Sequence, residues 1–185
     1  MKGLEIKNKK KILAINGSAG LNSSNASLIN CFAKLTEDFF ALTAFDLKSL
    51  PHFDPDLSVK NAPDAVSEFR NLIQNADGIL ICTPEYVFSI PSGLKNAIEW
   101  CVSTDVFLEK PIGLITASAD GEKAHRELQL ILKTVMAKFS SETTLLIQGV
   151  KGKINERDEI IDSKTLSDVL NFIEAYQLLV GVDDN

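Results

Sequence analysis

The segment "GILICTPEYVFSIPSGLKNAIEW" (residues 78–100) decides the fold of this chain. Its first six residues are almost continuously apolar, which is typical of a strand in a parallel sheet that helices cover on both faces. Two prolines, Pro84 and Pro91, then stiffen a loop that carries Tyr86 and Phe88. A helix is expected from Ser92 onwards. A buried strand therefore leads through an apolar loop, and we expect another surface to cover that loop.

Short apolar runs alternate with longer amphipathic runs along the whole chain. The five expected strands are residues 11–15, 40–46, 78–83, 111–117 and 144–149. The five expected helices are residues 25–35, 63–75, 92–102, 122–138 and 164–179. Strict alternation of this kind predicts a doubly wound α/β sheet. A ligand crevice is expected at the carboxyl ends of the strands, where the strand order reverses.

Two stretches, residues 47–62 and 151–162, are irregular in pattern. The first is rich in turn formers, and the second has mixed charge with two adjacent isoleucines. Long loops in compact domains are often functional. We expect each to be an oligomer contact or a rim of the site.

Composition and charge exclude several classes of protein. The chain has 185 residues, of which 45% are hydrophobic and 24% charged, so we expect one globular domain spanning residues 1–185. A net charge of −6 without a dense basic cluster argues against a nucleic-acid partner. No apolar run reaches the roughly 20 residues of a membrane span, and no signal-peptide pattern is present, which predicts a cytoplasmic protein. The three cysteines, Cys31, Cys82 and Cys101, lie in apolar surroundings without metal-ligand spacing and are expected to be reduced core thiols.

The stretch "NGSAGLNSSNASLI" (residues 16–29) joins the first strand to the first helix. Small residues and hydroxyl donors at the open end of a helix can bind an anion such as a monophosphate. It lacks the lysine of a P-loop and the third glycine of the dinucleotide motif, which disfavours nucleoside triphosphate chemistry. An N-capping turn is an equally good interpretation of the same residues.

The loop at residues 84–91 also has two interpretations. Tyr86 and Phe88 present flat apolar surface beside backbone amides, which suits a planar heteroaromatic ring. The alternative is an aromatic anchor in a dimer interface. The two interpretations are compatible.

Both loops resemble motifs of the NADPH-dependent FMN reductases, a family of flavodoxin-like fold that includes quinone and chromate reductases. The family's first loop, G-S-x-R-x-x-S-x-N, is matched at Gly17, Ser18, Ser23 and Asn25. Its second, P-E-Y-N-x-S-x-P-G-x-L-K-N-A-I-D-W, is matched in register at Pro84, Glu85, Tyr86, Ser89, Pro91, Leu94, Lys95, Asn96, Ala97, Ile98 and Trp100. A weaker third match is "SADGEKAHRELQLIL" (residues 118–132), which is similar to a small-residue loop leading into a helix with arginine and glutamine.

The resemblance implies a five-stranded parallel sheet in the order 2-1-3-4-5, with helices on both faces and FMN at the switch point. The resemblance assigns Ser18, Ser23 and Asn25 to the phosphate of FMN, with Ser24 nearby. It assigns the backbone of Pro84, Glu85, Tyr86 and Val87 to the ring, and Ser118, Asp120 and Gly121 to the far side. It also implies a homodimer or homotetramer, with the second motif near the interface.

Four residues depart from the family pattern, one of them being Glu99 in place of an aspartate. Gly20 stands where the family has an arginine, whose loss removes a charge-assisted bond to phosphate. Lys48 and Lys123 are the replacements that the sequence suggests. Val87 replaces an asparagine, and Ser92 replaces a glycine.

The implied activity is hydride transfer from NADPH or NADH through FMN to a small acceptor such as flavin or a quinone. Such chemistry needs no catalytic acid or base from the protein, because the cofactor carries the reaction. His52 and His125 are expected to be solvated surface histidines, and Glu85 and Glu99 are not expected to form a glycosidase pair. The alternative function is a flavin-binding electron carrier or redox module with little turnover of its own.

Overall fold

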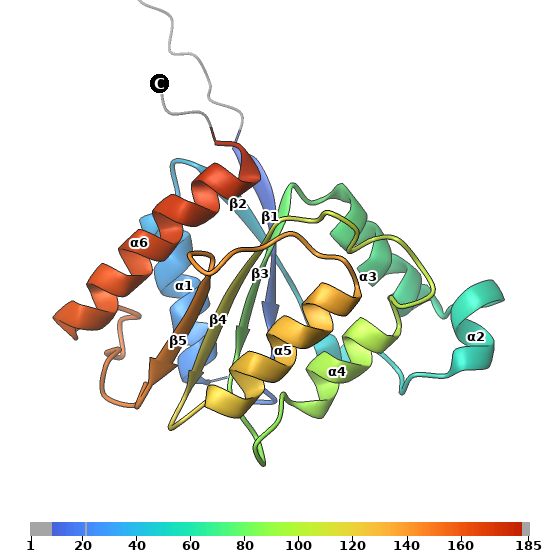
Figure 1. Ribbon diagram of the computed structural model, residues 1–185, viewed down its shortest axis with the longest axis horizontal. Coiled ribbons are helices and arrows are strands. Elements are labelled where there is room, and N and C mark those ends of the chain that lie inside the picture. The colour runs from blue at the N-terminus through green and yellow to red at the C-terminus, as the bar shows by residue number, and fades with distance from the viewer. Residues whose placement is uncertain (1–8, 21, 183–185) are drawn as a thin grey trace, which may run out of the picture.

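A computed structural model describes residues 9–20 and 22–182 of the chain. Its strands form one parallel sheet in the order β2-β1-β3-β4-β5, as predicted. They are β1 (Lys10–Asn16), β2 (Phe40–Phe45), β3 (Gly78–Thr83), β4 (Ile112–Ser118) and β5 (Thr144–Gln148). Because every strand points the same way, their carboxyl ends lie along one edge of the sheet (Figure 1).

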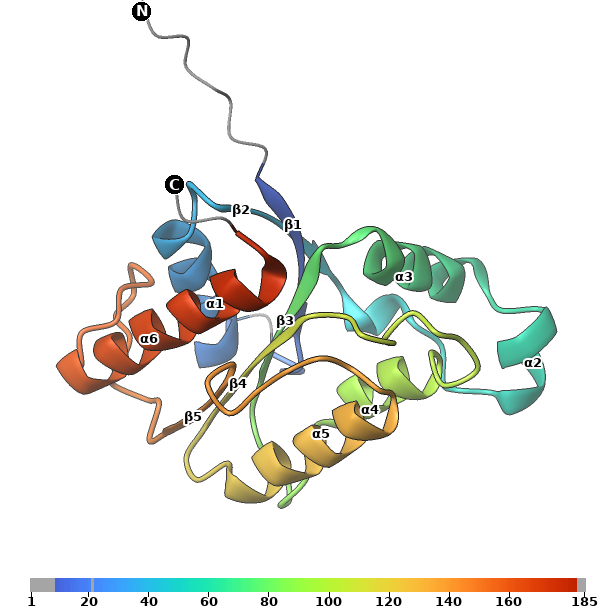
Figure 2. The same cartoon turned by 45° about the horizontal axis from the view of Figure 1, so that its top comes forward.

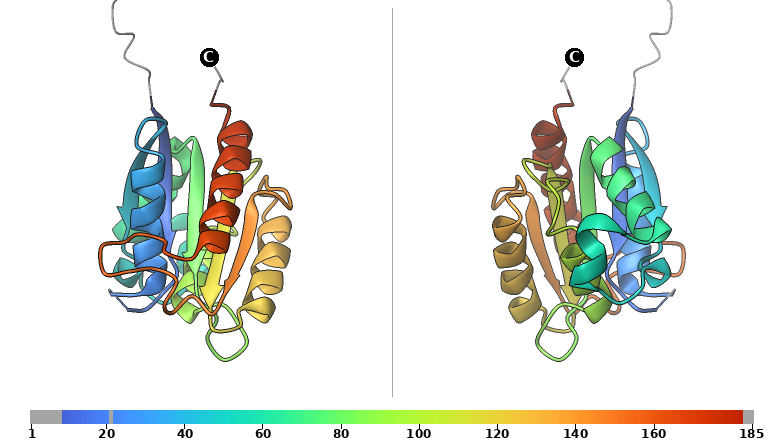
Figure 3. Two further views of the ribbon diagram at one scale, coloured as in Figure 1. Left: turned by 90° about the vertical axis from the view of Figure 1, so that its left-hand side faces the viewer. Right: turned by 90° about the vertical axis from the view of Figure 1, so that its right-hand side faces the viewer.

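Helices cover both faces of the sheet, as Figures 2 and 3 show. One layer contains α1 (Ser24–Leu35) and α6 (Ser163–Val180). The other contains α3 (Asp64–Asn75), α4 (Ser92–Glu99) and α5 (Glu122–Thr134). The short helix α2 (Pro55–Lys60) lies to the side of this second layer.

The buried strand β3 shows why its sequence is a continuous apolar run. Ile79 and Ile81 pack into the core under α3, α4 and α5, whereas Leu80 and Cys82 pack into the core under α1 and α6. Successive side chains of a strand point to opposite faces, so a strand covered on both sides needs apolar residues at every position.

The stretch 47–62, expected to be irregular, contains two short helical segments. Asp46 caps a 3-10 turn at Leu47–Ser49 by accepting a hydrogen bond from the amide of Lys48. Asp54 caps α2 in the same way, and Pro55 occupies its first turn. Aspartate at the cap and proline in the first turn favour helix starts, which is the local reason for both segments.

Two helices end earlier than their sequence pattern predicts. Helix α4 ends at Glu99 instead of continuing to Val102, and the carbonyl of the next residue, Trp100, accepts hydrogen bonds from the guanidinium of Arg70. Helix α5 ends at Thr134 instead of Lys138, because Lys138 bonds to the start of β4. In both cases a residue distant in sequence forms a hydrogen bond with a backbone group near the predicted end of the helix.

No helix of the described residues is long and apolar enough to cross a membrane. The loops that follow the strands gather at the carboxyl edge of the sheet (Figure 1), and this edge contains the candidate site.

Candidate functional site

A pocket of about 480 Å³ lies at the carboxyl ends of β1, β3, β4 and β5, and we call it the switch-point pocket. Seven residues expected to bind a cofactor line it: Ser18, Ser23, Ser24, Asn25, Pro84, Tyr86 and Ser118. Six lining residues were not predicted: Asn22, Ala117, Ala119, Gly149, Val150 and Lys151. The structure therefore brings together four segments that are far apart in the sequence, at the ends of β1, β3, β4 and β5.

The loop after β1, residues 16–25, is called the first loop, and side chains of its own order it. The side-chain oxygen of Asn16 accepts from the amide of Ser18 at 3.0 Å, and Ser18 Oγ accepts from the amide of Gly20 at 3.3 Å. Ser23 caps α1, with its Oγ accepting from the amide of Ala26 at 3.1 Å. The N-capping interpretation is thus confirmed for Ser23. The open end of α1 faces the pocket, where its backbone dipole favours an anion.

Asn25 has an unusual environment at the start of α1. Its side chain is only 3% exposed, and Nδ2 donates to the carbonyl of Ala117 at 3.1 Å. Its Oδ1 is buried and has no hydrogen-bond partner among the described residues. A buried acceptor left unpaired costs about 1 to 3 kcal/mol. A hydroxyl donor of a bound ligand would pair it.

Lys151 supplies a positive charge to the lining of the switch-point pocket. Lys48 and Lys123, the cations suggested by sequence, do not: Lys48 lines a different pocket beside Gly20, and Lys123 is exposed on α5. Lys151 follows β5, and the carboxyl ends of parallel strands lie along one edge of the sheet. Its position just after a strand could therefore have identified Lys151 as a residue of the site.

The loop after β3, residues 83–91, is called the second loop, and its tip is a tight turn. Tyr86 and Ser89 exchange two backbone hydrogen bonds of 2.9 and 3.0 Å. Between them, Val87 and Phe88 have φ values of 51° and 60°. Turns with two left-handed residues favour asparagine and glycine, and a β-branched residue there is strained. The asparagine of the family motif therefore falls at a position whose backbone suits it.

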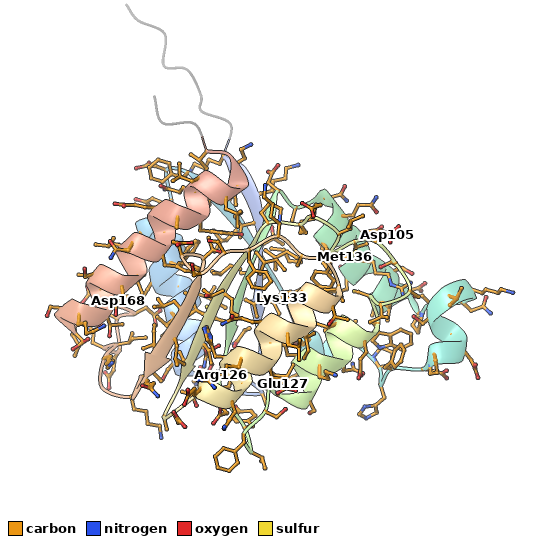
Figure 4. All side chains as sticks on the ribbon, viewed as in Figure 1. Asp105, Arg126, Glu127, Lys133, Met136 and Asp168 are labelled. Carbon is orange, nitrogen blue, oxygen red and sulfur yellow. The ribbon has the colours of Figure 1, made fainter. Side chains whose placement is uncertain are left out.

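Two carboxylates tie the second loop to α5. Glu127 Oε2 accepts from Ser89 Oγ at 2.7 Å and from the amide of Ile90 at 3.0 Å. Glu85 Oε2 accepts from the amide of Ala124 at 2.9 Å, in the first turn of α5. Figure 4 shows Glu127 on α5, the helix beside this loop. The second loop is therefore held by contacts that lie about 40 positions away in sequence.

Glu85 and Val87 were predicted to meet the ring through their backbone, and their side chains do not line the pocket. The carboxylate of Glu85 accepts a hydrogen bond from α5, and Val87 is 94% exposed at the tip of the turn. Glu99 pairs instead with Lys95 at 3.8 Å, so Glu85 and Glu99 have separate partners. Tyr86 does face the pocket, and its hydroxyl lies 3.1 Å from Ser18 Oγ.

Ser118, the last residue of β4, lines the pocket, whereas Asp120 and Gly121 shape the loop that follows. Asp120 Oδ1 accepts from Gln148 Nε2 at 2.7 Å. Gly121 has a φ of 91° at the start of α5, and a Cβ atom there would lie 3.0 Å from Leu146. A left-handed backbone with so little space requires glycine.

The expectation that His125 is a solvated surface histidine is wrong. Its ring is half-buried, and Nδ1 lies 2.9 Å from the hydroxyl of Thr116. Burial lowers the pKa of His125 below its ordinary value of 6.5, because the charged form loses hydration.

The three cysteines are free thiols in buried positions, as predicted. Burial raises the pKa of Cys101 to about 12 and raises the pKa values of Cys31 and Cys82 as well. Within the described residues, no cluster of histidine, cysteine or acidic side chains could hold a metal ion.

Comparison with known families gives a match over residues 10–151 to the family described as NADPH-dependent FMN reductase. The chain belongs to the NADPH-dependent FMN reductase family. It is therefore a flavin-dependent oxidoreductase that uses FMN with a nicotinamide nucleotide as reductant.

Relatives within the NADPH-dependent FMN reductase family match most of the chain. An NADH-dependent flavin reductase subunit 2 from Lactobacillus johnsonii is 35% identical over 84% of this chain and 89% of its own length. A quinone reductase from Escherichia coli is 26% identical over 91% and 94%. Among solved structures, the flavoenzyme NAD(P)H:(acceptor) oxidoreductase FerB from Paracoccus denitrificans superimposes with a TM-score of 0.81 at 25% identity, covering 92% of this chain and 97% of FerB.

The residues of the switch-point pocket fit the FMN that the family name implies. The open end of α1 and the ammonium of Lys151 complement a phosphate, and Asn25 Oδ1 is an unpaired acceptor for a hydroxyl. Pro84 and Tyr86 offer apolar surface for a ring. The pocket thus offers donors, an acceptor and apolar surface, which are the kinds of group that FMN would need.

Proposed function

We propose that this chain oxidises NADPH or NADH and passes the electrons to a small acceptor, free flavin or a quinone, with FMN held in the switch-point pocket. FMN would supply hydride-transfer chemistry between the nicotinamide and the acceptor. The observation that carries the proposal is the buried, unpartnered Oδ1 of Asn25 in the wall of this pocket.

The first loop would bind the phosphate. Ser18, Ser23 and Ser24 line the pocket with hydroxyl groups, and the amides at the start of α1 add donors. Lys151 would supply the cation that the family's arginine supplies elsewhere, because Gly20 has no side chain to do so. A charge-assisted bond to phosphate is stronger than a neutral one, so this lysine matters for affinity.

The second loop would place the ring. Pro84 and Tyr86 would form one wall, and Ser118 also lines the pocket. The backbone amides of Glu85 and Val87 would face the polar edge of the ring, because Pro84 has no N–H and the amide of Tyr86 donates to the carbonyl of Ser89. The residues of the pocket need only bind and orient the ring and exclude water, so we assign no catalytic acid or base.

We also propose that residues 1–185 act as one domain and that the working form is a homodimer or homotetramer in the cytoplasm. The tip of the second loop exposes apolar surface beside the pocket: Val87 is 94% and Phe88 74% exposed. Exposed apolar groups beside a site indicate a partner surface. Light scattering of the purified protein tests this, and Phe88→Ser is expected to shift the mass towards the monomer.

The visible absorption spectrum of the purified chain tests the cofactor proposal. We expect flavin peaks that persist after FMN is added and the protein is desalted, and we expect rapid NAD(P)H oxidation when a quinone is present. A colourless protein that releases all added FMN would contradict the proposal. A protein that keeps FMN but oxidises NAD(P)H only slowly would favour the electron-carrier function instead.

A further inference from the structure

The tip of the second loop is a strained turn, and strain of this kind persists only where surrounding contacts fix the conformation. Val87 and Phe88 both have left-handed backbones without being glycine or asparagine. The two backbone hydrogen bonds between Tyr86 and Ser89 close the turn but do not connect it to the rest of the molecule. Another group must therefore hold this turn in place beside the pocket.

Glu127 on α5 is that group by its geometry. A single oxygen, Oε2, accepts from Ser89 Oγ at 2.7 Å and from the amide of Ile90 at 3.0 Å. Its side chain is half-buried, and hydrogen bonds to a carboxylate are stronger than those between neutral groups. With these bonds, the amide, carbonyl and hydroxyl of Ser89 are all engaged.

The turn fixed by Glu127 includes a wall of the switch-point pocket. Tyr86 closes the turn through its backbone and lines the pocket with its side chain, whose hydroxyl reaches Ser18. A displacement of the turn would therefore move Tyr86 and the neighbouring backbone amides together. Precise placement of binding groups depends on supporting contacts of this kind.

We propose that Glu127 is a positioning residue for the flavin: it holds the strained turn so that Tyr86 and the amides of the second loop form the ring-binding wall. This inference rests on the proposed function, because it assumes that FMN occupies the switch-point pocket. It assigns no contact between Glu127 and the ring. Glu127 acts through Ser89 and Ile90 alone.

The test compares three variants of the full chain by titration with FMN, following the fluorescence of the flavin. We expect Glu127→Ala to weaken FMN binding about tenfold, since it removes two hydrogen bonds to one charged acceptor. Glu127→Gln keeps one oxygen that can accept both bonds and should stay within about threefold of the original chain. Glu122→Ala is the matched control on the same helix, because the carboxylate of Glu122 pairs with Arg126 instead of with the second loop. We expect no change in that control.

A second comparison separates positioning of the turn from a general effect on stability. Val87→Asn with Phe88→Gly gives the Asn-Gly pair that turns of this type favour. In this background the loss caused by Glu127→Ala should shrink from about tenfold to less than about threefold, because the turn no longer needs holding. If Glu127→Ala alone does not fold, its effect on FMN binding is measured in the Val87→Asn, Phe88→Gly background.

Several outcomes would overturn the inference. These are unchanged FMN binding in Glu127→Ala, an equal loss in Glu127→Gln, or a loss that the Asn-Gly background does not reduce. A wild-type chain that binds no FMN would overturn the proposed function itself, and the inference with it. A wild-type chain that binds FMN, with unaltered binding in Glu127→Ala, would overturn the inference alone.

Discussion

The first and second loops lie on the same pocket but are held in different ways. The first loop is ordered by its own neighbours, with hydrogen bonds that span two or three residues at Asn16, Ser18 and Ser23. The second loop has an unfavourable local conformation and is held by Glu85 and Glu127 through contacts with α5. A loop held locally can leave its donors free for a ligand, whereas a loop held from outside can present a shape that its own sequence disfavours.

The two loops contact each other at Gly17, and a substitution there is expected to have the largest effect. The amide of Gly17 bonds to the carbonyl of Cys82, and a Cβ atom at Gly17 would lie 2.4 Å from Thr83 Oγ1 and 2.8 Å from Thr83 Cβ. Gly17→Ala is expected to cost on the order of 2 kcal/mol in unfolding free energy, because buried Thr83 has no room to move. Chemical denaturation measures this. Gly20→Ala, whose Cβ would meet only Ser18 Oγ at 3.9 Å, should be close to neutral.

Asn25 tests whether the first loop uses its free groups for the ligand. Asn25→Ala removes the unpaired Oδ1 and the donor to Ala117, and it should weaken FMN binding about tenfold. Isothermal titration with FMN measures the change. Asn30→Ala, on the same helix but bonded to Asp158 outside the pocket, is the control. If Asn25→Ala and Asn30→Ala bind FMN equally well, the unpaired Oδ1 of Asn25 does not bind the ligand, and the proposed function loses its main support.

Val87 tests the strain of the second loop directly. Val87→Asn places a residue that tolerates the left-handed region at a φ of 51°, and the unfolding free energy should rise by about 1 kcal/mol. Val102→Asn is a matched control at another exposed valine without positive φ, and it should bring no gain. If the two variants have equal stability, the second loop is not strained as its backbone indicates.

Lys151 tests how much a positive charge in the pocket contributes to FMN binding. Lys151→Ala should weaken FMN binding about threefold at low ionic strength and less at high salt, since exposed charges are screened. Riboflavin, which has no phosphate, should bind equally to the variant and the original chain. Lys123→Ala serves as control, and an equal effect of both substitutions would show that only net charge matters.

His125 lies on α5, the helix to which the second loop is bonded, and we expect its pH-dependent effect to be the smallest. Its pKa in the folded chain is lowered by burial, so the unfolded chain binds the proton more tightly. The stability contributed by neutral His125 is complete above about pH 6.5 and is lost as the pH falls from there towards the lowered pKa. Denaturation between about pH 7.5 and pH 5.5 should show a steeper loss in the original chain than in His125→Gln. Parallel curves would contradict this assignment.

The sequence was sufficient for the parts of the structure that depend on nearby residues. The continuous apolar run of β3 predicted burial on both faces, and small polar residues after β1 predicted the capped start of α1. The alternation of strands and helices predicted the doubly wound sheet, and the resemblance to the family implied its strand order. The predicted helix ends were wrong where the backbone bonds to a residue distant in sequence. Arg70 donates to the carbonyl of Trp100, and the backbone of Lys138 bonds to the start of β4.

The candidate site divides in the same way. The pocket-lining residues of the first loop were predicted from composition and motif, except Asn22. Lys151 was missed because no motif extends beyond β5. The role of Glu127 was not visible because its partners lie 37 and 38 positions away in the sequence. The left-handed backbone at Val87 and Phe88 could not be expected from residue types that disfavour it.

The packing of Trp100 has a practical consequence for all of these measurements. The chain contains one tryptophan, and in the fold it is fully buried, with Nε1 donating to the carbonyl of Pro51 at 2.8 Å. Its fluorescence therefore comes from a single, solvent-shielded environment at the end of α4. Because flavins absorb where tryptophan emits, energy transfer from Trp100 would report FMN binding without any added label, and its red shift on unfolding would report stability in the same sample.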